Sequence, residues 1–173
     1  MPRSKPDSEA RGSKGRREKS SRPQPEPDHA SVRDRAIGLL ARREHTRQEL
    51  KRKLRQRELP LELIQPVLDE LIAENLLSEA RYAEMLVHSR VNRGYGPLRI
   101  LAEAQDVGAD EALIRQALDE AAPDWLALAQ EAHRKRFGAP PKDFKERVKQ
   151  ARFLASRGFS ASTVSAVLGE IYE

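Results

Sequence analysis

Histidines, cysteines and glycine-rich motifs are the first places to look for chemistry in this chain of 173 residues. The chain has no cysteine, so thiol nucleophiles, disulfides and cysteine-bound zinc are excluded. No HExxH motif and no GxxxxGK phosphate loop is present, and the Gly94–Gly96 pair follows no predicted strand. The four histidines are scattered outside any metal-binding spacing: His29, His45, His88 and His133. The sequence therefore predicts no catalytic site, no metal and no cofactor.

Carboxylates are abundant, with 27 Asp and Glu residues, but their placement does not suggest acid–base catalysis. They alternate with Lys and Arg on helix faces that we expect to be solvated. An enzyme with a diffuse carboxylate site remains an alternative, although it would need convergent titratable groups that this pattern does not supply.

Cationic side chains gather on particular predicted helices. The segment 47–57, RQELKRKLRQR, is strongly basic, whereas the segments around 62–74 and 110–120 carry mostly acidic side chains. This division indicates either ordinary salt bridges within the chain or a two-sign surface that suits a complex of nucleic acid and protein. Such a partner could be a filament of DNA and protein, or DNA alone. The residues that we expect to contact it are Arg47, Lys51, Arg55, Arg90, Arg93, Tyr95, Arg99, Arg147 and Arg152.

The stretch NRGYGPLRI, at 92–100, interrupts an otherwise helical pattern. Gly94 suits a left-handed helix end, and Gly96 and Pro97 suit the cap and first position of the next helix, so these three residues form a predicted structural turn. This turn does not require the aromatic ring of Tyr95 or the flanking arginines. Arginine can bind phosphate or carboxylate at two points, and tyrosine is a common interface anchor, so we expect partner contacts there.

A period of 50 residues supplies the elements that must position these side chains. Without gaps, the segments 57–71, 107–121 and 157–171 align, and their apolar residues coincide at i, i+3, i+4 and i+7. That spacing is one buried stripe of a helix, repeated three times. The predicted fold class is all-α, with three tandem three-helix repeats that form an elongated stack.

The expected divisions are a disordered basic tail rich in Pro and Ser (1–30) and three helical repeats (31–76, 77–122 and 123–173). In the first repeat we expect helices near 32–43, 47–57 and 62–74. Caps are predicted at Thr46 (in a capping box with Glu49), Ser78, Asp110 and Ser160, and a left-handed residue at Asn75.

Charge and hydropathy restrict the function further. Residues 1–30 hold eight basic and five acidic side chains, so the tail carries +3 of the net charge of +5 and the rest of the chain is close to neutral. Three-helix units permit a helix-turn-helix reader of DNA, but the acidic starts of the third helices would repel phosphates. No apolar run approaches the length of about 18 residues that spans a bilayer, and the expected location is cytoplasmic.

Four stretches of the chain resemble the RecX family, small bacterial regulators of the RecA recombinase: 36–54, 67–100, 135–138 and 152–168. The second includes an Arg-Gly-x-Gly-Pro motif at 93–97. One departure is Val107, which stands before Gly108 where the family often has a basic residue.

The resemblance, which covers about residues 33–172, implies a curved stack of three-helix units without enzymatic activity. It implies a monomer that binds along the groove of a RecA–DNA filament and suppresses ATP hydrolysis, DNA pairing and strand exchange. Contact with single- or double-stranded DNA alone is expected to be weak and non-specific, and no membrane partner is expected. Family members can differ in the sign of their effect. The alternative is a general helical nucleic-acid-binding adaptor without a recombinase partner.

Overall fold

The computed structural model describes residues 26–169, and within this range the chain forms nine helices and no strand. The helices are α1 (His29–Leu40), α2 (Arg47–Arg55), α3 (Leu61–Ala73), α4 (Glu79–Asn92), α5 (Pro97–Asp106), α6 (Glu111–Ala121), α7 (Trp125–Phe137), α8 (Phe144–Ser156) and α9 (Ala161–Leu168).

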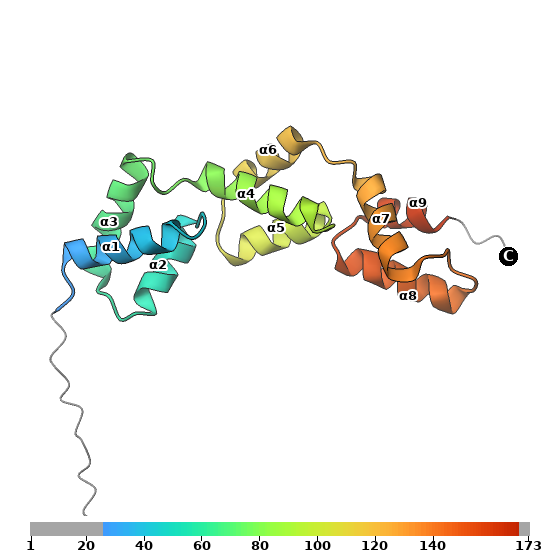
Figure 1. Cartoon of the computed structure of the whole chain (residues 1–173), viewed down its shortest axis with the longest axis horizontal. Coiled ribbons are helices and arrows are strands. Elements are labelled where there is room, and N and C mark those ends of the chain that lie inside the picture. The colour runs from blue at the N-terminus through green and yellow to red at the C-terminus, as the bar shows by residue number, and fades with distance from the viewer. Residues whose placement is uncertain (1–25, 170–173) are drawn as a thin grey trace, which may run out of the picture.

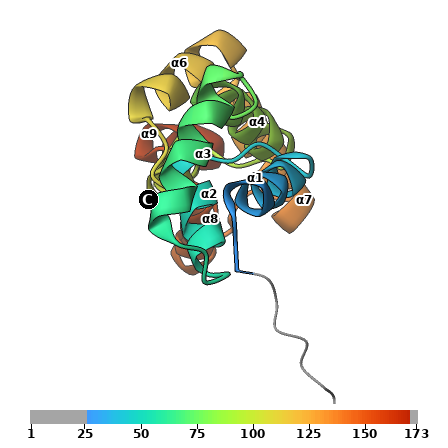
Figure 2. The same ribbon diagram turned by 90° about the vertical axis from the view of Figure 1, so that its left-hand side faces the viewer.

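Three three-helix units follow one another in an elongated row (Figure 1). Unit one is α1–α3, unit two is α4–α6 and unit three is α7–α9. Each unit has a hydrophobic core cluster of its own. Seen from the end of the row, the three units lie one behind another (Figure 2). The predicted fold class is confirmed, whereas most of the predicted tail, residues 1–25, lies outside the described residues.

The repeat register is confirmed in the cores. Ile64 and Ile114 are fully buried and Val164 is 9% exposed, while Leu54, Ala104 and Leu154 are buried in the preceding helices. The stripe is weaker at the end of α6, where Leu118 is only partly buried and Ala121 is exposed. Unit two has alanine at positions where unit one has Val67 and Leu71, so its third helix offers less apolar surface to bury.

Side-chain caps begin the helices at the predicted residues. The oxygens of Thr46, Ser78, Asp110 and Ser160 each accept a hydrogen bond from a backbone N–H in the first turn that follows. The predicted capping box at Thr46 is wrong in one half, because the Glu49 carboxylate pairs with Arg43 and Lys53 and not with the cap backbone.

Helix boundaries shift slightly from their expected positions. α1 begins at His29, before the expected start, because Asp28 and Ser31 form a reciprocal capping box. Pro66 lies inside α3, which begins at Leu61. Asn75 and Gly94 have the expected positive φ values of 57° and 72°.

Glu58 provides a test of backbone strain in unit one. Its φ is 60°, whereas the equivalent positions in units two and three hold Gly108 and Gly158. A non-glycine residue in the left-handed region costs about 1 kcal/mol or more, and the Glu58 side chain is exposed. We expect Glu58→Gly to raise the free energy of unfolding by about 1 kcal/mol in chemical denaturation. Unchanged or lower stability would show that the Glu58 side chain makes a compensating contribution.

Candidate partner-binding site

The turn 94–97, which holds the candidate residue Tyr95, forms the contact between units two and three. The Gly96 N–H donates to the Arg157 carbonyl oxygen (2.8 Å), and the Leu98 N–H donates to the Gly158 carbonyl oxygen (3.1 Å). A Cβ on Gly96 would lie 2.3 Å from the Gly158 oxygen, and one on Gly158 would lie 2.3 Å from the Arg99 nitrogen. We call this contact the second joint; both glycines are needed there because backbone meets backbone.

The first joint, between units one and two, repeats this arrangement one period earlier in the sequence. The Thr46 hydroxyl donates to the Val107 carbonyl oxygen (2.7 Å), and the Arg47 N–H donates to the Glu79 carboxylate (2.7 Å). Gly108 has φ +67°, and a Cβ there would meet the Gln48 side chain. Thr46 and Gly96 are equivalent by the 50-residue shift, as are Val107 and Arg157. The turn after the first helix of one unit therefore contacts the turn before the third helix of the next.

Tyr95 is enclosed by guanidinium groups of the second joint. Arg157 of unit three lies 5.0 Å from the ring centroid and Arg99 lies 5.7 Å from it. Arg157 also donates to the carbonyl oxygen of Arg93 (3.1 Å). Arg157 is not among the candidate residues that the sequence predicted. Arg157 aligns with Val107 under the 50-residue shift, and each is followed by a glycine, which could have indicated that Arg157 lies at a contact between units. Tyr95 thus has a role within the chain, and its contact with a partner stays a prediction.

Two of the predicted partner-binding arginines share one carboxylate. Arg90 and Arg99 both donate through Nε to Glu103, with a distance of 2.9 Å for Arg99. Burial would raise the pKa of Glu103, but the hydrogen bonds from Arg99 and Arg90 outweigh it and hold that pKa below its usual value. Arg93 is exposed and forms no ion pair within the described part of the chain. The middle of the candidate site is therefore less cationic than the sequence indicates.

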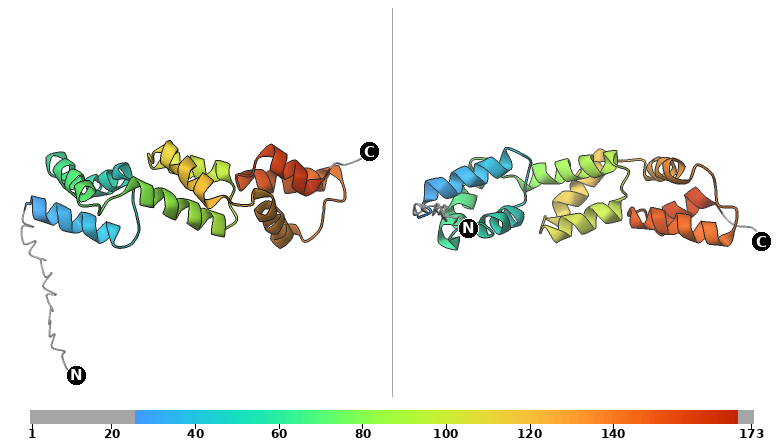
Figure 3. Two further views of the ribbon diagram at one scale, coloured as in Figure 1. Left: turned by 90° about the horizontal axis from the view of Figure 1, so that it is seen from above. Right: turned by 60° about the horizontal axis from the view of Figure 1, so that its bottom comes forward.

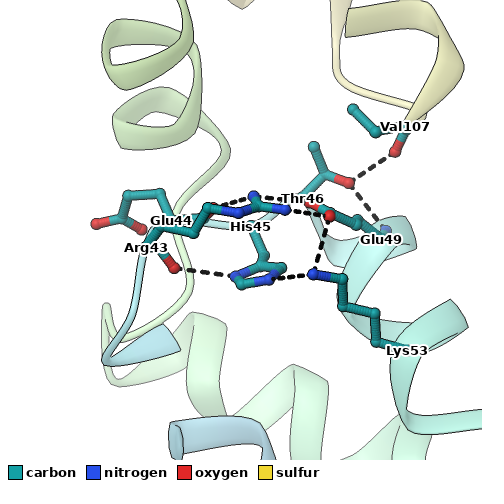
Figure 4. Close-up of polar contacts among 7 residues, drawn as sticks. All are labelled: Arg43, Glu44, His45, Thr46, Glu49, Lys53 and Val107. Atoms are coloured by element: carbon teal, nitrogen blue, oxygen red, sulfur yellow. Dashed lines mark hydrogen bonds and ion pairs between the residues drawn. The ribbon is translucent and has the colours of Figure 1, made fainter. Parts of the chain in front are cut away.

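His45 occupies the equivalent of the Tyr95 position in the first joint, in a buried polar network (Figure 4). It is 1% exposed, with Nδ1 2.9 Å from the Arg43 carbonyl oxygen and Nε2 3.0 Å from the Lys53 ammonium. Nδ1 must therefore carry the proton, and Nε2 accepts from Lys53. Glu49 completes the network with Lys53 (3.3 Å) and Arg43 (3.0 Å).

A pH dependence of stability follows from this network. Burial, together with the charges of Arg43 and Lys53, lowers the pKa of His45 in the folded chain. The folded state therefore favours neutral His45, and this contribution is present above the unfolded-state pKa of about 6.5 and is lost as pH falls from there towards the folded value. We expect the free energy of unfolding to drop between pH 7.5 and 5.5, and to drop less in His45→Gln. Equal drops in the two proteins, measured by urea denaturation, would contradict this role.

A groove with a volume of about 1020 Å³ lies beside the first joint. Four cations of α2 line it, and opposite them lie the turn 108–110 and Glu79. Positions four apart on a helix lie about 6 Å apart along its axis, so Arg47, Lys51 and Arg55 form a row. The fourth cation, Arg52, follows Lys51 directly in the sequence.

The cations that line the groove differ in whether they have a partner within the chain. The Arg47 guanidinium donates to Asp69 (2.5 Å) and Gln65 (3.1 Å). Lys51, Arg52 and Arg55 form no ion pair with any residue between 26 and 169. We call these three the α2 cation group. Two of them, Lys51 and Arg55, are among the predicted partner-binding residues.

Glu79 lies at the opposite wall and has a distinct environment. Its Oε1 accepts from the Arg47 N–H, while its buried Oε2 has no partner among the described residues. Burial raises the pKa of Glu79, and the nearby Asp110 charge adds to the rise. Both effects act against the hydrogen bond from the Arg47 N–H, which favours the charged carboxylate.

The two predicted partner-binding residues of unit three, Arg147 and Arg152, have different environments. Arg147 donates to the carbonyl oxygen of Leu168 (3.1 Å), at the end of α9, and so holds α8 and α9 together. Arg152 is exposed, as are Lys145 and Lys149, which lie on the same helix face at i, i+4 and i+7 spacing. We call Lys145, Lys149 and Arg152 the α8 cation group.

No cluster of three or more His, Asp or Glu side chains suited to a metal ion occurs within residues 26–169. In the same range, no helix is both long and apolar enough to cross a membrane.

Comparison with known proteins matches the three units separately. Models of the first, second and third three-helix domains of RecX match residues 33–71, 78–118 and 123–168, respectively.

Similar proteins include the regulatory protein RecX of Pseudomonas entomophila (strain L48), which is 50% identical over 139 residues, with 80% of this chain and 90% of that protein covered. Regulatory protein RecX of Halorhodospira halophila is 48% identical over 137 residues, which cover 79% of this chain and 85% of that one. A crystal structure of regulatory protein RecX has a TM-score of 0.70 and 26% identity, covering 81% of this chain and 72% of that chain. The structure of RecX from Lactobacillus salivarius, at 22% identity, has the same fold with a TM-score of 0.66, covering 80% of this chain and 93% of that one.

Proposed function

Because the chain belongs to the RecX family of regulatory proteins, we propose that it binds the RecA–DNA filament in the cytoplasm and inhibits the recombinase. Binding would suppress ATP hydrolysis, DNA pairing and strand exchange in recombination and DNA repair. The observation that carries this proposal is the match of all three units, in order, to the three RecX domains.

The shape of the chain supports a partner that is itself long and repetitive. The three units form an extended row, and both joints use the same turn-to-turn contact, so the row presents equivalent faces at regular intervals. A filament offers equivalent binding positions on successive subunits, and contacts at several of them strengthen one another when the spacing matches. The chain would act as one body that bridges subunits.

The charge distribution supports a partner made of both nucleic acid and protein. The α2 and α8 cation groups are free to meet phosphates or protein carboxylates. On α3, by contrast, Glu70 and Glu74 pair with Arg33, so part of the predicted acidic surface is used within unit one. The cationic half of the predicted two-sign surface is therefore the better candidate for the partner contact.

A general nucleic-acid-binding adaptor is the second candidate, and the unpaired cation groups favour it. Its affinity would follow phosphate number and fall steeply with salt, without any need for RecA. A RecA-directed regulator would still act on the recombinase at salt concentrations at which the regulator binds bare DNA only weakly.

RecA-catalysed ATP hydrolysis on single-stranded DNA tests the proposal. We expect added chain, at a concentration below that of RecA, to reduce the steady-state hydrolysis rate and the yield of strand exchange. Reduction that appears only when the chain saturates the DNA would indicate simple competition for DNA. Faster hydrolysis or exchange would reverse the sign of the proposed regulation.

A further inference from the structure

The second helices of the three units lie along one long edge of the row. α2, α5 and α8 follow one another on the same side in the view of Figure 1 and again when the molecule is tilted (Figure 3). They also correspond to one another under the 50-residue shift. Side chains exposed on these helices can therefore contact one extended partner.

The α2 cation group forms one end of this edge. Arg52 and Arg55 are exposed and Lys51 is partly buried, and all three line the groove of about 1020 Å³. The opposite wall contributes Glu79, whose Oε1 accepts from the Arg47 N–H, and Asp110, whose side chain accepts from the Ala112 N–H. This end thus has three unpaired cations at the side of an open trough.

The α8 cation group forms the other end. Carboxylates that could neutralise it are directed elsewhere: the Glu146 side chain accepts from the Lys142 N–H (2.9 Å), and Asp143 accepts from the Glu146 N–H (2.7 Å). Lys145, Lys149 and Arg152 form no ion pair inside the described range. Three exposed cations therefore remain in a row on α8.

The middle of the edge carries no unpaired cation among the residues of α5. α5 exposes Leu98 (55% exposed), Ala102, Gln105 and the acidic Asp106, while the guanidinium of Arg99 is held by Glu103 and lies over Tyr95. The three second helices thus present cations, a section without unpaired cations, and cations again.

We propose that this edge holds the phosphate backbone of one nucleic-acid strand at two separate sites, the α2 and α8 cation groups, with the α5 face as a spacer. The inference deepens the proposed function and takes from it the nucleic-acid partner. Each group holds three cations within about two turns of helix, and such a close set of cations suits the repeating charges of a sugar–phosphate chain, whereas carboxylates on a protein surface have no such repeat. The predicted cluster at Arg90, Arg93, Tyr95 and Arg99 lies outside both sites.

The test is the salt dependence of binding to a fluorescent oligodeoxythymidine, measured by anisotropy. One variant carries Lys51→Gln, Arg52→Gln and Arg55→Gln, and another carries Lys145→Gln, Lys149→Gln and Arg152→Gln; glutamine is a good helix former, so folding should be preserved. Each lost phosphate contact should reduce the slope of log affinity against log salt by about 0.7, so each triple variant should lose about 2 units and the combined variant about 4.

A control with Arg115→Gln, Arg134→Gln and Lys135→Gln removes the same charge from α6 and α7, and it should keep the wild-type slope. Wild-type slopes in both test variants, an equal loss in the control, or no measurable binding by the wild-type chain at low salt would each overturn the proposal.

Filament binding separates this inference from the proposed function. If the test variants lose RecA-filament binding but keep the wild-type slope on the oligonucleotide, this edge contacts the RecA protein and not nucleic acid. That result overturns the inference and leaves the proposed function standing. A wild-type chain that does not bind filaments, with reduced slopes in the test variants, would reject the proposed function and support the nucleic-acid edge.

Discussion

Gly158→Ala is expected to destabilise the second joint by about 3 kcal/mol, because two costs combine at this position. The φ of +89° is strained for alanine, and the new Cβ would lie 2.3 Å from the Arg99 backbone nitrogen. To relieve the overlap, the turns must separate, which breaks the hydrogen bonds from Gly96 and Leu98. Chemical denaturation followed by far-ultraviolet circular dichroism measures the loss.

Two other glycines separate these costs. Gly94 has φ +72°, and a Cβ added there would have no neighbouring atom within 4 Å, so Gly94→Ala should cost only the backbone strain of about 1–2 kcal/mol. Gly96 has φ −87°, but its Cβ would lie 2.3 Å from the Gly158 oxygen, so Gly96→Ala tests the overlap without the strain. If Gly158→Ala costs no more than Gly94→Ala, the backbones of the two turns do not meet closely at the second joint.

Leu68→Ala should destabilise unit one by about 2–5 kcal/mol, because Leu68 is completely buried in the first core. Leu118 stands at the equivalent position in unit two but is only partly buried, and Leu118→Ala should cost less. Leu168 is 8% exposed, so Leu168→Ala should cost about as much as Leu68→Ala. Denaturant midpoints of the three variants give the comparison.

An equal cost at Leu68 and Leu118 would contradict the weaker packing of α6. Since units of a repeat protein interact with their neighbours, each transition should be checked for more than one step before a free energy is assigned.

The fold was predictable because its signals are local and occur three times. Apolar spacing located the third helices, and short polar residues located the caps at Ser78, Asp110 and Ser160. Each of these signals acts within about one turn of helix, so a linear sequence displays it directly. The weaker burial of Leu118 could not be read in this way, because it depends on how much apolar surface the neighbouring helices offer.

The candidate site was harder to predict because the pairing of charges is set by tertiary contacts. Arg90 and Arg99 pair with Glu103, and Arg157 reaches Tyr95 from another unit, while the partner-binding role of Arg90 and Arg99 stays a prediction. Positive charge in the sequence does not distinguish an arginine used in a joint from one that faces solvent. Lys51, Arg55 and Arg152 form no ion pair within residues 26–169, so their predicted partner contact stays a prediction, while Arg147 holds α9.

Co-sedimentation of the full chain with RecA filaments, compared with bare single-stranded DNA at the same salt concentration, tests the RecA-directed role most directly. We expect the chain to pellet with filaments at concentrations where the bare DNA retains little of it, since the filament offers protein contacts as well as phosphates. Equal retention by filaments and by bare DNA would contradict a RecA-directed role and would identify the chain as a general nucleic-acid-binding adaptor.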